Sequence, residues 1–153
     1  QLKNLQGLYV ENNQLTTLPD SIGQLENLQT LHLSKNRLNI LSEGIGQLEN
    51  LQTLNLSENR LTTLPEGIGQ LKNLQSLTLS ENQLTTLPKS IGRLKNLRYL
   101  DLWGNQFTAI PENIGQLESL QMLDLSNNPI AENIPQWLKD ARFKVVVDNL
   151  IHF

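Results

Sequence analysis

The sequence predicts an α/β repeat protein, a solenoid with a parallel β-sheet on its concave side and short helical turns on its convex side. Three leucine columns and one asparagine column, each repeating every 23 residues, support this prediction. The central leucine column is Leu8, Leu31, Leu54, Leu77, Leu100 and Leu123, and the asparagine column is Asn13, Asn36, Asn59, Asn82, Asn105 and Asn128. A period of this length, kept over six copies, is the signature of a repeat architecture.

A short strand is expected early in each copy. In residues 51–56, which read LQTLNL, Leu54 and Leu56 are two positions apart and therefore share one face of an extended chain. A strand this short cannot bury its apolar face alone. Stacking identical copies buries that face and pairs the backbones as a parallel sheet. We therefore expect six parallel strands centred on the central leucine column.

A short helical turn is expected on the return path of each copy. In residues 65–71, which read PEGIGQL, proline suits the first position of a helical turn because its missing N–H is not needed there. Ile68 and Leu71 lie three positions apart and point inward together, whereas the glycines disfavour a long α-helix. An acidic residue suits the start of the turn electrostatically, and four copies carry one: Asp20, Glu43, Glu66 and Glu112.

The asparagine column has a structural explanation. An asparagine side chain both donates and accepts hydrogen bonds, so it can pair with backbone that leaves the strand and with the loop of the neighbouring coil. Leaving such buried backbone groups unpaired would cost about 1–3 kcal/mol each. We expect a ladder of structural side chains here and no catalytic role.

The chain is expected to form a single domain over residues 1–153, in which residues 1–4 are the tail of an incomplete repeat, 5–133 form about six repeats and 134–153 form a C-terminal cap. Residues 136–141 follow Pro135 and predict a longer helix, and the β-branched residues of 142–147 predict a final strand. Trp137 is expected to cover the end of the core. The apolar tail, residues 148–153, is expected to fold back over the last coil, with dimerisation through an exposed end of the solenoid as the alternative to a monomer.

The consensus LxxLxLxxNxLxxLPxxIGxLxN resembles the leucine-rich repeat over nearly the whole chain. It is most similar to the 23-residue bacterial form of that family, which is abundant in spirochaetes. The resemblance implies a right-handed solenoid that binds other macromolecules and has no catalytic activity. It also implies a secreted or cell-surface location, with a role at the bacterial surface or in host interaction.

Composition and motifs argue against several other functions. The formal charge of −3 is spread along the chain and gives no basic patch for nucleic acid. The absence of cysteine excludes disulfides and thiolate sites, and no apolar run approaches the roughly 20 residues of a membrane span. No zinc-protease motif, phosphate-binding loop or dinucleotide fingerprint is present. We expect no enzyme activity, no catalytic residues, no metal site and no cofactor.

The outward-facing columns of the predicted sheet supply the candidate contact residues. Small polar side chains fill the middle copies, and the large ones gather near the C-terminal end, where five candidates lie: Tyr99, Asp101, Trp103, Met122 and Asp124. Exposed aromatic side chains of this kind commonly mark interfaces. The alternative for Trp103 is that it turns over the rim and packs there. Tyr9 and His32 form a second, weaker cluster at the other end.

We expect a non-catalytic protein-binding module that docks a protein partner on its concave face. The first alternative is a carbohydrate-binding surface, in which Tyr99 and Trp103 stack on sugar rings while Asp101 and Asp124 accept hydroxyl protons. The second is a structural segment of a longer repeat protein.

Overall fold

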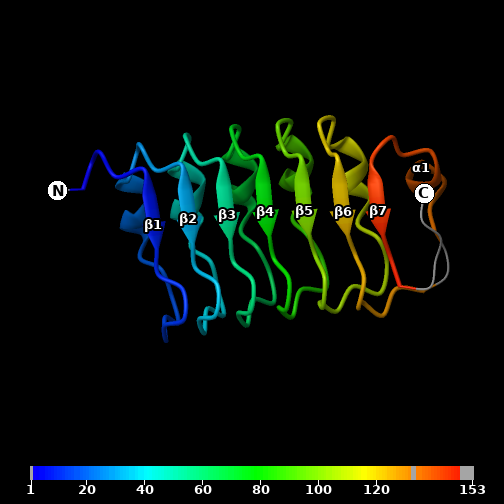
Figure 1. Ribbon diagram of the computed structural model, residues 1–153, viewed down its shortest axis with the longest axis horizontal. Helices are drawn as coiled ribbons and strands as arrows, with labels where there is room; N and C mark the ends of the chain where they lie inside the picture. Colours follow the sequence, from blue (N-terminus) through cyan, green and yellow to red (C-terminus); the bar gives the residue numbers. More distant parts are fainter. Residues whose placement is uncertain (1, 132–133, 149–153) are drawn as a thin grey trace.

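The computed structural model describes residues 2–131 and 134–148 and shows one seven-stranded parallel sheet in chain order (Figure 1). The strands are β1 Gly7–Tyr9, β2 Thr30–His32, β3 Thr53–Asn55, β4 Ser76–Thr78, β5 Tyr99–Asp101, β6 Met122–Asp124 and β7 Lys144–Val146. Six strands centre on the expected leucines, and the seventh lies within the expected final strand. The predicted α/β solenoid with a parallel sheet is therefore confirmed.

The register stacks equivalent residues of successive copies, as in the pairs Leu54 with Leu77 and Leu77 with Leu100. The central leucines of β2 to β6 are buried, whereas their neighbours along each strand are partly or fully exposed. Leu8 of β1 is only partly buried because a coil covers it on one side alone. The alternation places the core behind the sheet and leaves small polar side chains in front.

The return paths form five short 3₁₀ helices, η1 Asp20–Gln24, η2 Glu43–Gln47, η3 Glu66–Gln70, η4 Lys89–Arg93 and η5 Glu112–Gln116. Each of their isoleucines is buried and supports the coil from inside. Neighbouring helices touch backbone to backbone, since a Cβ built on Gly46 would lie 2.5 Å from the carbonyl oxygen of Gly67. A side chain at that position would push adjacent coils apart, which explains the glycine after Ile22, Ile45 and Ile68.

The acidic residues that begin these helices also connect neighbouring coils. Glu43 Oε2 accepts a hydrogen bond from the backbone N–H of Gly67 at 2.8 Å, and Glu66 Oε2 accepts one from the N–H of Ser90 at 3.1 Å. The Ser90 side chain is the main group that lowers the pKa of Glu66 below its ordinary value, and backbone N–H groups add to this effect while desolvation opposes it. The carboxylate form of Glu66 therefore fits the folded state best.

The asparagine column forms the expected ladder between coils. Asn59 is buried, accepts the backbone N–H of Leu38 at 3.0 Å and donates to the carbonyl oxygens of Leu33 and Leu56, each at 3.0 Å. Leu33 and Leu38 belong to the preceding coil, so one amide ties two coils together. Equivalent bonds are made by Asn36, Asn82, Asn105 and Asn128.

The C-terminal cap differs from the expectation in the length of its helix. The α1 helix, Gln136–Lys139, is one turn long and ends before Asp140, so the longer helix expected over residues 136–141 is wrong. The chain has to leave the helix there, because β7 begins at Lys144. The backbone N–H of Lys144 donates to the carbonyl oxygen of Gln121, just before β6, at 2.9 Å. The predicted capping role of Trp137 is confirmed, since its ring packs against Gly115 and the core. The predicted fold-back concerns the tail of residues 148–153, of which 149–153 lie outside the described residues.

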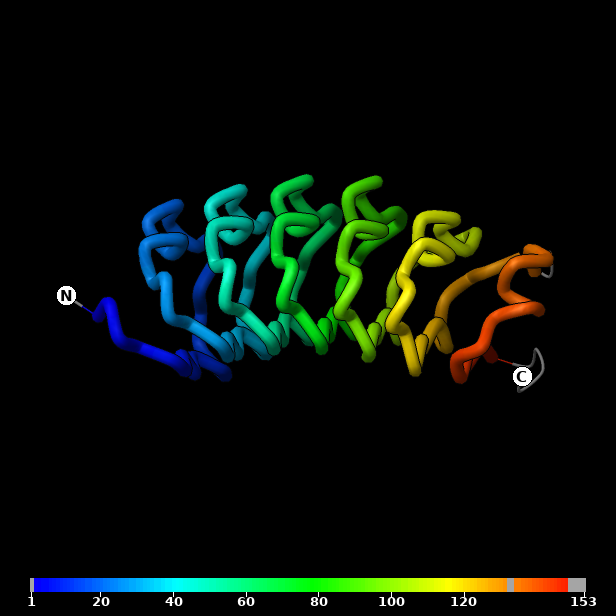
Figure 2. The backbone as a smooth tube through the Cα atoms, turned by 90° about the horizontal axis from the view of Figure 1, so that it is seen from above, coloured from blue at the N-terminus to red at the C-terminus, as the bar shows by residue number. Residues whose placement is uncertain are grey.

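Figure 2 shows the coils as a shallow arch with the strands along its inner edge and the 3₁₀ helices along its outer edge. Within the described ranges, every helix is too short to cross a lipid bilayer. The sheet therefore offers one continuous inner surface on which side chains from seven strands lie side by side.

Candidate functional site

The structure brings four of the predicted site residues together on β5 and β6. Tyr99 pairs in register with Met122, and Asp101 pairs with Asp124, so the four side chains form two adjacent rows on the inner surface of the sheet. They line a shallow pocket of about 130 Å³, together with Leu77, Thr78 and Leu100. The chain is folded this way because the alternating leucines of β5 and β6 point into the core and turn the remaining side chains toward the pocket.

Tyr99 supplies the aromatic side chain of this pocket. Its exposed fraction is 49%, although the preceding strands carry Thr53 and Ser76 in the same row. Burial of an aromatic side chain of this size by a partner supplies much contact area with little loss of rotamer freedom. Tyr99 therefore offers accessible aromatic surface at the pocket.

Asp101 and Asp124 each have a local structural task in addition to their charge. Oδ1 of Asp101 accepts the backbone N–H of Trp103 at 3.0 Å, and Oδ1 of Asp124 accepts that of Ser126 at 2.9 Å. Asn55 makes the same bond to the N–H of Ser57 at 3.0 Å on β3. An uncharged amide thus serves this turn equally well, so the geometry of the turn does not account for the carboxylate charge at β5 and β6.

Trp103 lies in the turn just after β5, beyond the end of the strand. Its exposed fraction is 37%, and it is not among the residues that line the pocket of Tyr99. The turn owes its shape to Gly104, which has a φ of +65° in the left-handed region. Lys35, Glu58 and Glu81 adopt the same positive φ in other copies, where the conformation strains a side-chain-bearing residue.

The second predicted cluster lies at the other end of the sheet. The rings of Tyr9 and His32 meet edge to face with centroids 5.0 Å apart, and Nδ1 of His32 lies 3.2 Å from Oε1 of Glu11. Tyr9 is 61% exposed, the larger exposure of the two tyrosines. Tyr9 and His32 begin a row of paired residues that continues through Asn55 and Thr78 to Asp101. Both clusters therefore face the same inner surface.

Three residues of this surface did not enter the sequence-based set. Lys144 and Val146 extend the two rows beyond Met122 and Asp124, because β7 joins the sheet in register. Because the 23-residue repeat is interrupted before β7, aligning the copies does not give this register. Glu11 joins the Tyr9 cluster through His32. Its position two residues after Tyr9, on the same face of an extended chain, was the signal that could have found it.

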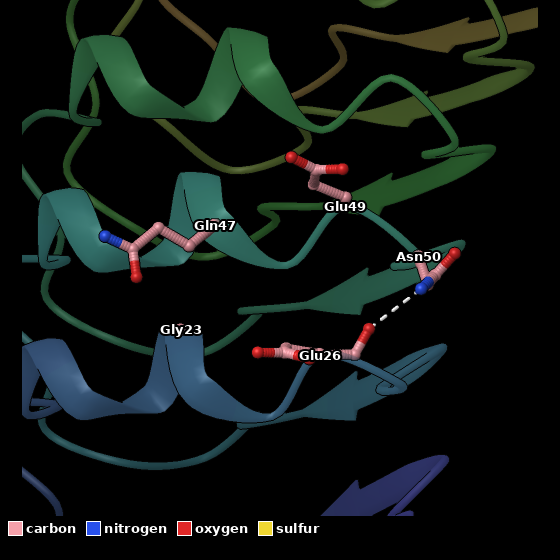
Figure 3. Close-up of a pocket in the computed structure, with 5 residues that line it drawn as sticks. All are labelled: Gly23, Glu26, Gln47, Glu49 and Asn50. Atoms are coloured by element: carbon pink, nitrogen blue, oxygen red, sulfur yellow. Dashed lines mark hydrogen bonds between the residues drawn. The ribbon is translucent and has the colours of Figure 1, made fainter. Parts of the chain in front are cut away.

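A larger depression, of about 430 Å³, lies away from these clusters between η1 and η2 and is lined by Gly23, Glu26, Gln47, Glu49 and Asn50 (Figure 3). The amide of Asn50 crosses it to donate to the backbone carbonyl of Glu26 at 2.8 Å. The same bond recurs from Asn73 to Glu49 and from Asn96 to Lys72, each at 2.8 Å. This depression is the regular seam between coils, and the repetition of its bond accounts for its polar lining.

Comparison with known proteins agrees with the geometry. The family model described as "Leucine rich repeat" matches residues 1–38, 27–84, 49–107 and 72–130. Among curated proteins none matches the chain.

Among solved structures, a leucine-rich-repeat protein of the spirochaete Leptospira interrogans superposes with a TM-score of 0.68 and 36% sequence identity. The alignment covers 97% of this chain and 45% of that protein, so the chain spans less than half the length of this neighbour. The family model reaches from residue 1 to residue 130, and the fold and the period of the leucines agree with it, so the chain belongs to the leucine-rich-repeat family.

Proposed function

We propose that this chain is a non-catalytic protein-binding module that docks its partner on the inner surface of the sheet. The contact centre consists of Tyr99, Asp101, Trp103, Met122 and Asp124, with Tyr9 and His32 as a second contact region. The observation that carries the proposal is the pocket on β4 to β6, where a half-exposed tyrosine, a methionine and two carboxylates replace the small polar side chains of β3. Family membership supports it, because leucine-rich repeats are typically non-catalytic interaction modules.

The chemistry of the pocket suits a protein side chain. An interface gains most from a few large side chains that become desolvated at its centre, and Tyr99 and Met122 offer such apolar area. Asp101 and Asp124 flank them and add charge that orients the partner and speeds its association. Trp103 at the end of β5 extends the apolar contact past the pocket.

Carbohydrate binding is less well supported. A stacked sugar would need Tyr99 and Trp103 to hold the same ring, but Trp103 does not line the pocket that Tyr99 lines. A glycan array included in the test below separates the two ligand classes. Action at a bacterial surface or on a host protein is part of the proposal and rests on the family resemblance; cell fractionation of the source bacterium tests it.

The proposal is tested by an unbiased partner screen with the wild type, Tyr99→Ala, Trp103→Ala and Ser57→Ala in parallel. A partner of the pocket is captured by the wild type and by Ser57→Ala, and its affinity falls by about 2 kcal/mol or more in each aromatic variant. Folding stability should change by no more than about 0.5 kcal/mol, because exposed side chains contribute little to the core.

The opposite pattern contradicts the proposal. If Trp103→Ala lowers the melting temperature strongly and every captured protein still binds, Trp103 is a rim-packing residue. If Tyr99→Ala also leaves the affinity for every captured protein unchanged, the pocket is not the contact centre.

A further inference from the structure

Resting on the proposed function, we infer that the inner surface binds an extended segment of a protein partner through two basic side chains, one at each end of the sheet. The two clusters share a chemistry that the middle of the sheet lacks. Each combines an exposed tyrosine with carboxylate groups, namely Tyr99 with Asp101 and Asp124, and Tyr9 with Glu11.

The C-terminal anchor can hold one cation. Asp101 and Asp124 are direct neighbours on adjacent strands, about 4.8 Å apart by the spacing of a sheet, a separation that one guanidinium can bridge. Each carboxylate uses Oδ1 for its own turn, and among the described residues no hydrogen bond reaches either Oδ2. The ring of Tyr99 offers a face on which a cation is favoured.

Neighbouring charges decide where that cation lies. Lys144 of β7 extends the row of Tyr99 and Met122, whereas the uncharged Val146 extends the row of Asp101 and Asp124. A basic side chain would be repelled on the Lys144 side and attracted on the carboxylate side. The cation is therefore expected over the row of the two aspartates.

The N-terminal anchor repeats this chemistry. Glu11 Oε1 pairs with His32 at 3.2 Å, and His32 supports the ring of Tyr9. Lys35, in the turn after β2, is paired with Glu58 of the next coil at 3.6 Å. A second cation can then contact Glu11 and the exposed face of Tyr9.

The rows of inner-surface side chains between the anchors carry no charge and are rich in hydrogen-bonding groups. The middle strands and the residues just after them present Thr53, Asn55, Ser57, Ser76, Thr78 and Ser80. Hydroxyl and amide side chains pair with free backbone N–H and C=O groups. An extended chain has such groups to offer, whereas an α-helix has already used its own, so the surface favours an extended segment.

The sheet fixes the distance between the two basic residues. The N-terminal anchor lies over β1 and β2 and the C-terminal anchor over β5 and β6, which is four strand spacings or about 19 Å. An extended chain advances about 3.3 Å per residue, so the two basic side chains should be about six residues apart.

Synthetic peptides test both the chemistry and the spacing. Fluorescence polarisation is measured with the labelled probe Arg-Ser-Thr-Ser-Thr-Ser-Arg, with Arg-Ser-Arg and with a seven-residue peptide that has a single arginine. The matched probe should bind about tenfold or more tightly than either control, because the second contact becomes intramolecular. Its affinity should fall as salt is raised.

Charge-neutral variants assign each contact to its anchor. The double variant Asp101→Asn/Asp124→Asn keeps the turns, as Asn55 demonstrates on β3, and Glu11→Gln keeps an acceptor for His32. Each set should reduce the advantage of the matched probe to about that of the single-arginine peptide. Thr62→Ala, at an exposed position on the return path outside the inner surface, should leave it unchanged.

Three outcomes would overturn the inference: equal affinity for all peptides, no binding of any of them, or an advantage that survives Glu11→Gln. None of these outcomes contradicts the proposed function if the binding of a captured partner still requires Tyr99 and Trp103. Conversely, spacing-dependent peptide binding that is lost in both variant sets supports the inference.

Discussion

Replacement of Asn82 by alanine should destabilise the solenoid strongly without touching its apolar core. Asn82 is buried, and its amide donates to the carbonyl oxygens of Leu56 and Leu79, each at 3.0 Å. Its Oδ1 accepts the backbone N–H of Leu61, also at 3.0 Å. The substitution removes these three bonds and a longer one, of 3.3 Å, from the amide to the carbonyl oxygen of Ser80.

The four backbone groups are not affected equally. The carbonyl of Ser80 keeps a bond from the N–H of Glu58 at 2.8 Å. The carbonyl of Leu56 keeps a bond from Asn59 at 3.0 Å, and that of Leu79 keeps one from Asn105 at 2.9 Å. The N–H of Leu61 keeps no partner among the described residues. One orphaned buried donor costs about 1–3 kcal/mol, and the loss of the bonds that the Asn82 amide donates raises the expected total to about 2–4 kcal/mol.

Urea unfolding followed by circular dichroism measures this cost, with Asn13→Ala as the matched control. Asn13 is the ladder residue of the first coil and is exposed, and within the described part of the chain it donates only to Val10 and Glu11 of its own coil. The carbonyl of Val10 keeps its bond from Asn36 at 2.9 Å, so the control should cost less than about 1 kcal/mol. Equal losses in the free energy of unfolding for Asn82→Ala and Asn13→Ala would refute the reasoning, because the asparagine bonds between coils would then add nothing to stability.

Three further measurements test other parts of the fold. Leu77→Ala should cost about 2–5 kcal/mol in urea melts, and Thr78→Ala should stay within about 0.5 kcal/mol; equal costs would contradict the alternation of the strand. Gly104→Ala should destabilise by about 1–2 kcal/mol, because alanine disfavours the positive φ at this turn, and an unchanged melting temperature would show that the turn relaxes. Glu66→Gln should be less stable than the wild type at neutral pH, and this gap should close as the pH falls through the lowered pKa of Glu66, since its Ser90-bonded carboxylate stabilises the fold only when ionised; a gap that is independent of pH would argue against this role.

Part of the candidate site could be predicted by aligning equivalent residues of successive 23-residue copies, and part of it could not. Tyr99 and Met122, like Asp101 and Asp124, could be assigned to adjacent strands because a parallel stack keeps equivalent residues in register. Lys144 and Val146 were missed, because the chain between β6 and β7 departs from the 23-residue period and gives no register to count from. The shallow pocket lined by Tyr99 and Thr78 also depends on side-chain rotamers, which the spacing of residues in the sequence does not predict.

The sequence by itself determined the fold of this protein: the strands, the inward faces, the asparagine ladder and the short turns all follow from a period of 23 residues. Such a repeat is strongly specified because each coil meets only its neighbours, so local pattern and long-range contact coincide. Tertiary structure alone decided that Trp103 lies outside the pocket, that Glu11 reaches His32, and that the cap helix stops after one turn so that β7 can pair with β6. These features depend on rotamers, on the turn at Gly104 and on an irregular connection, and none of them recurs with the period of the repeat.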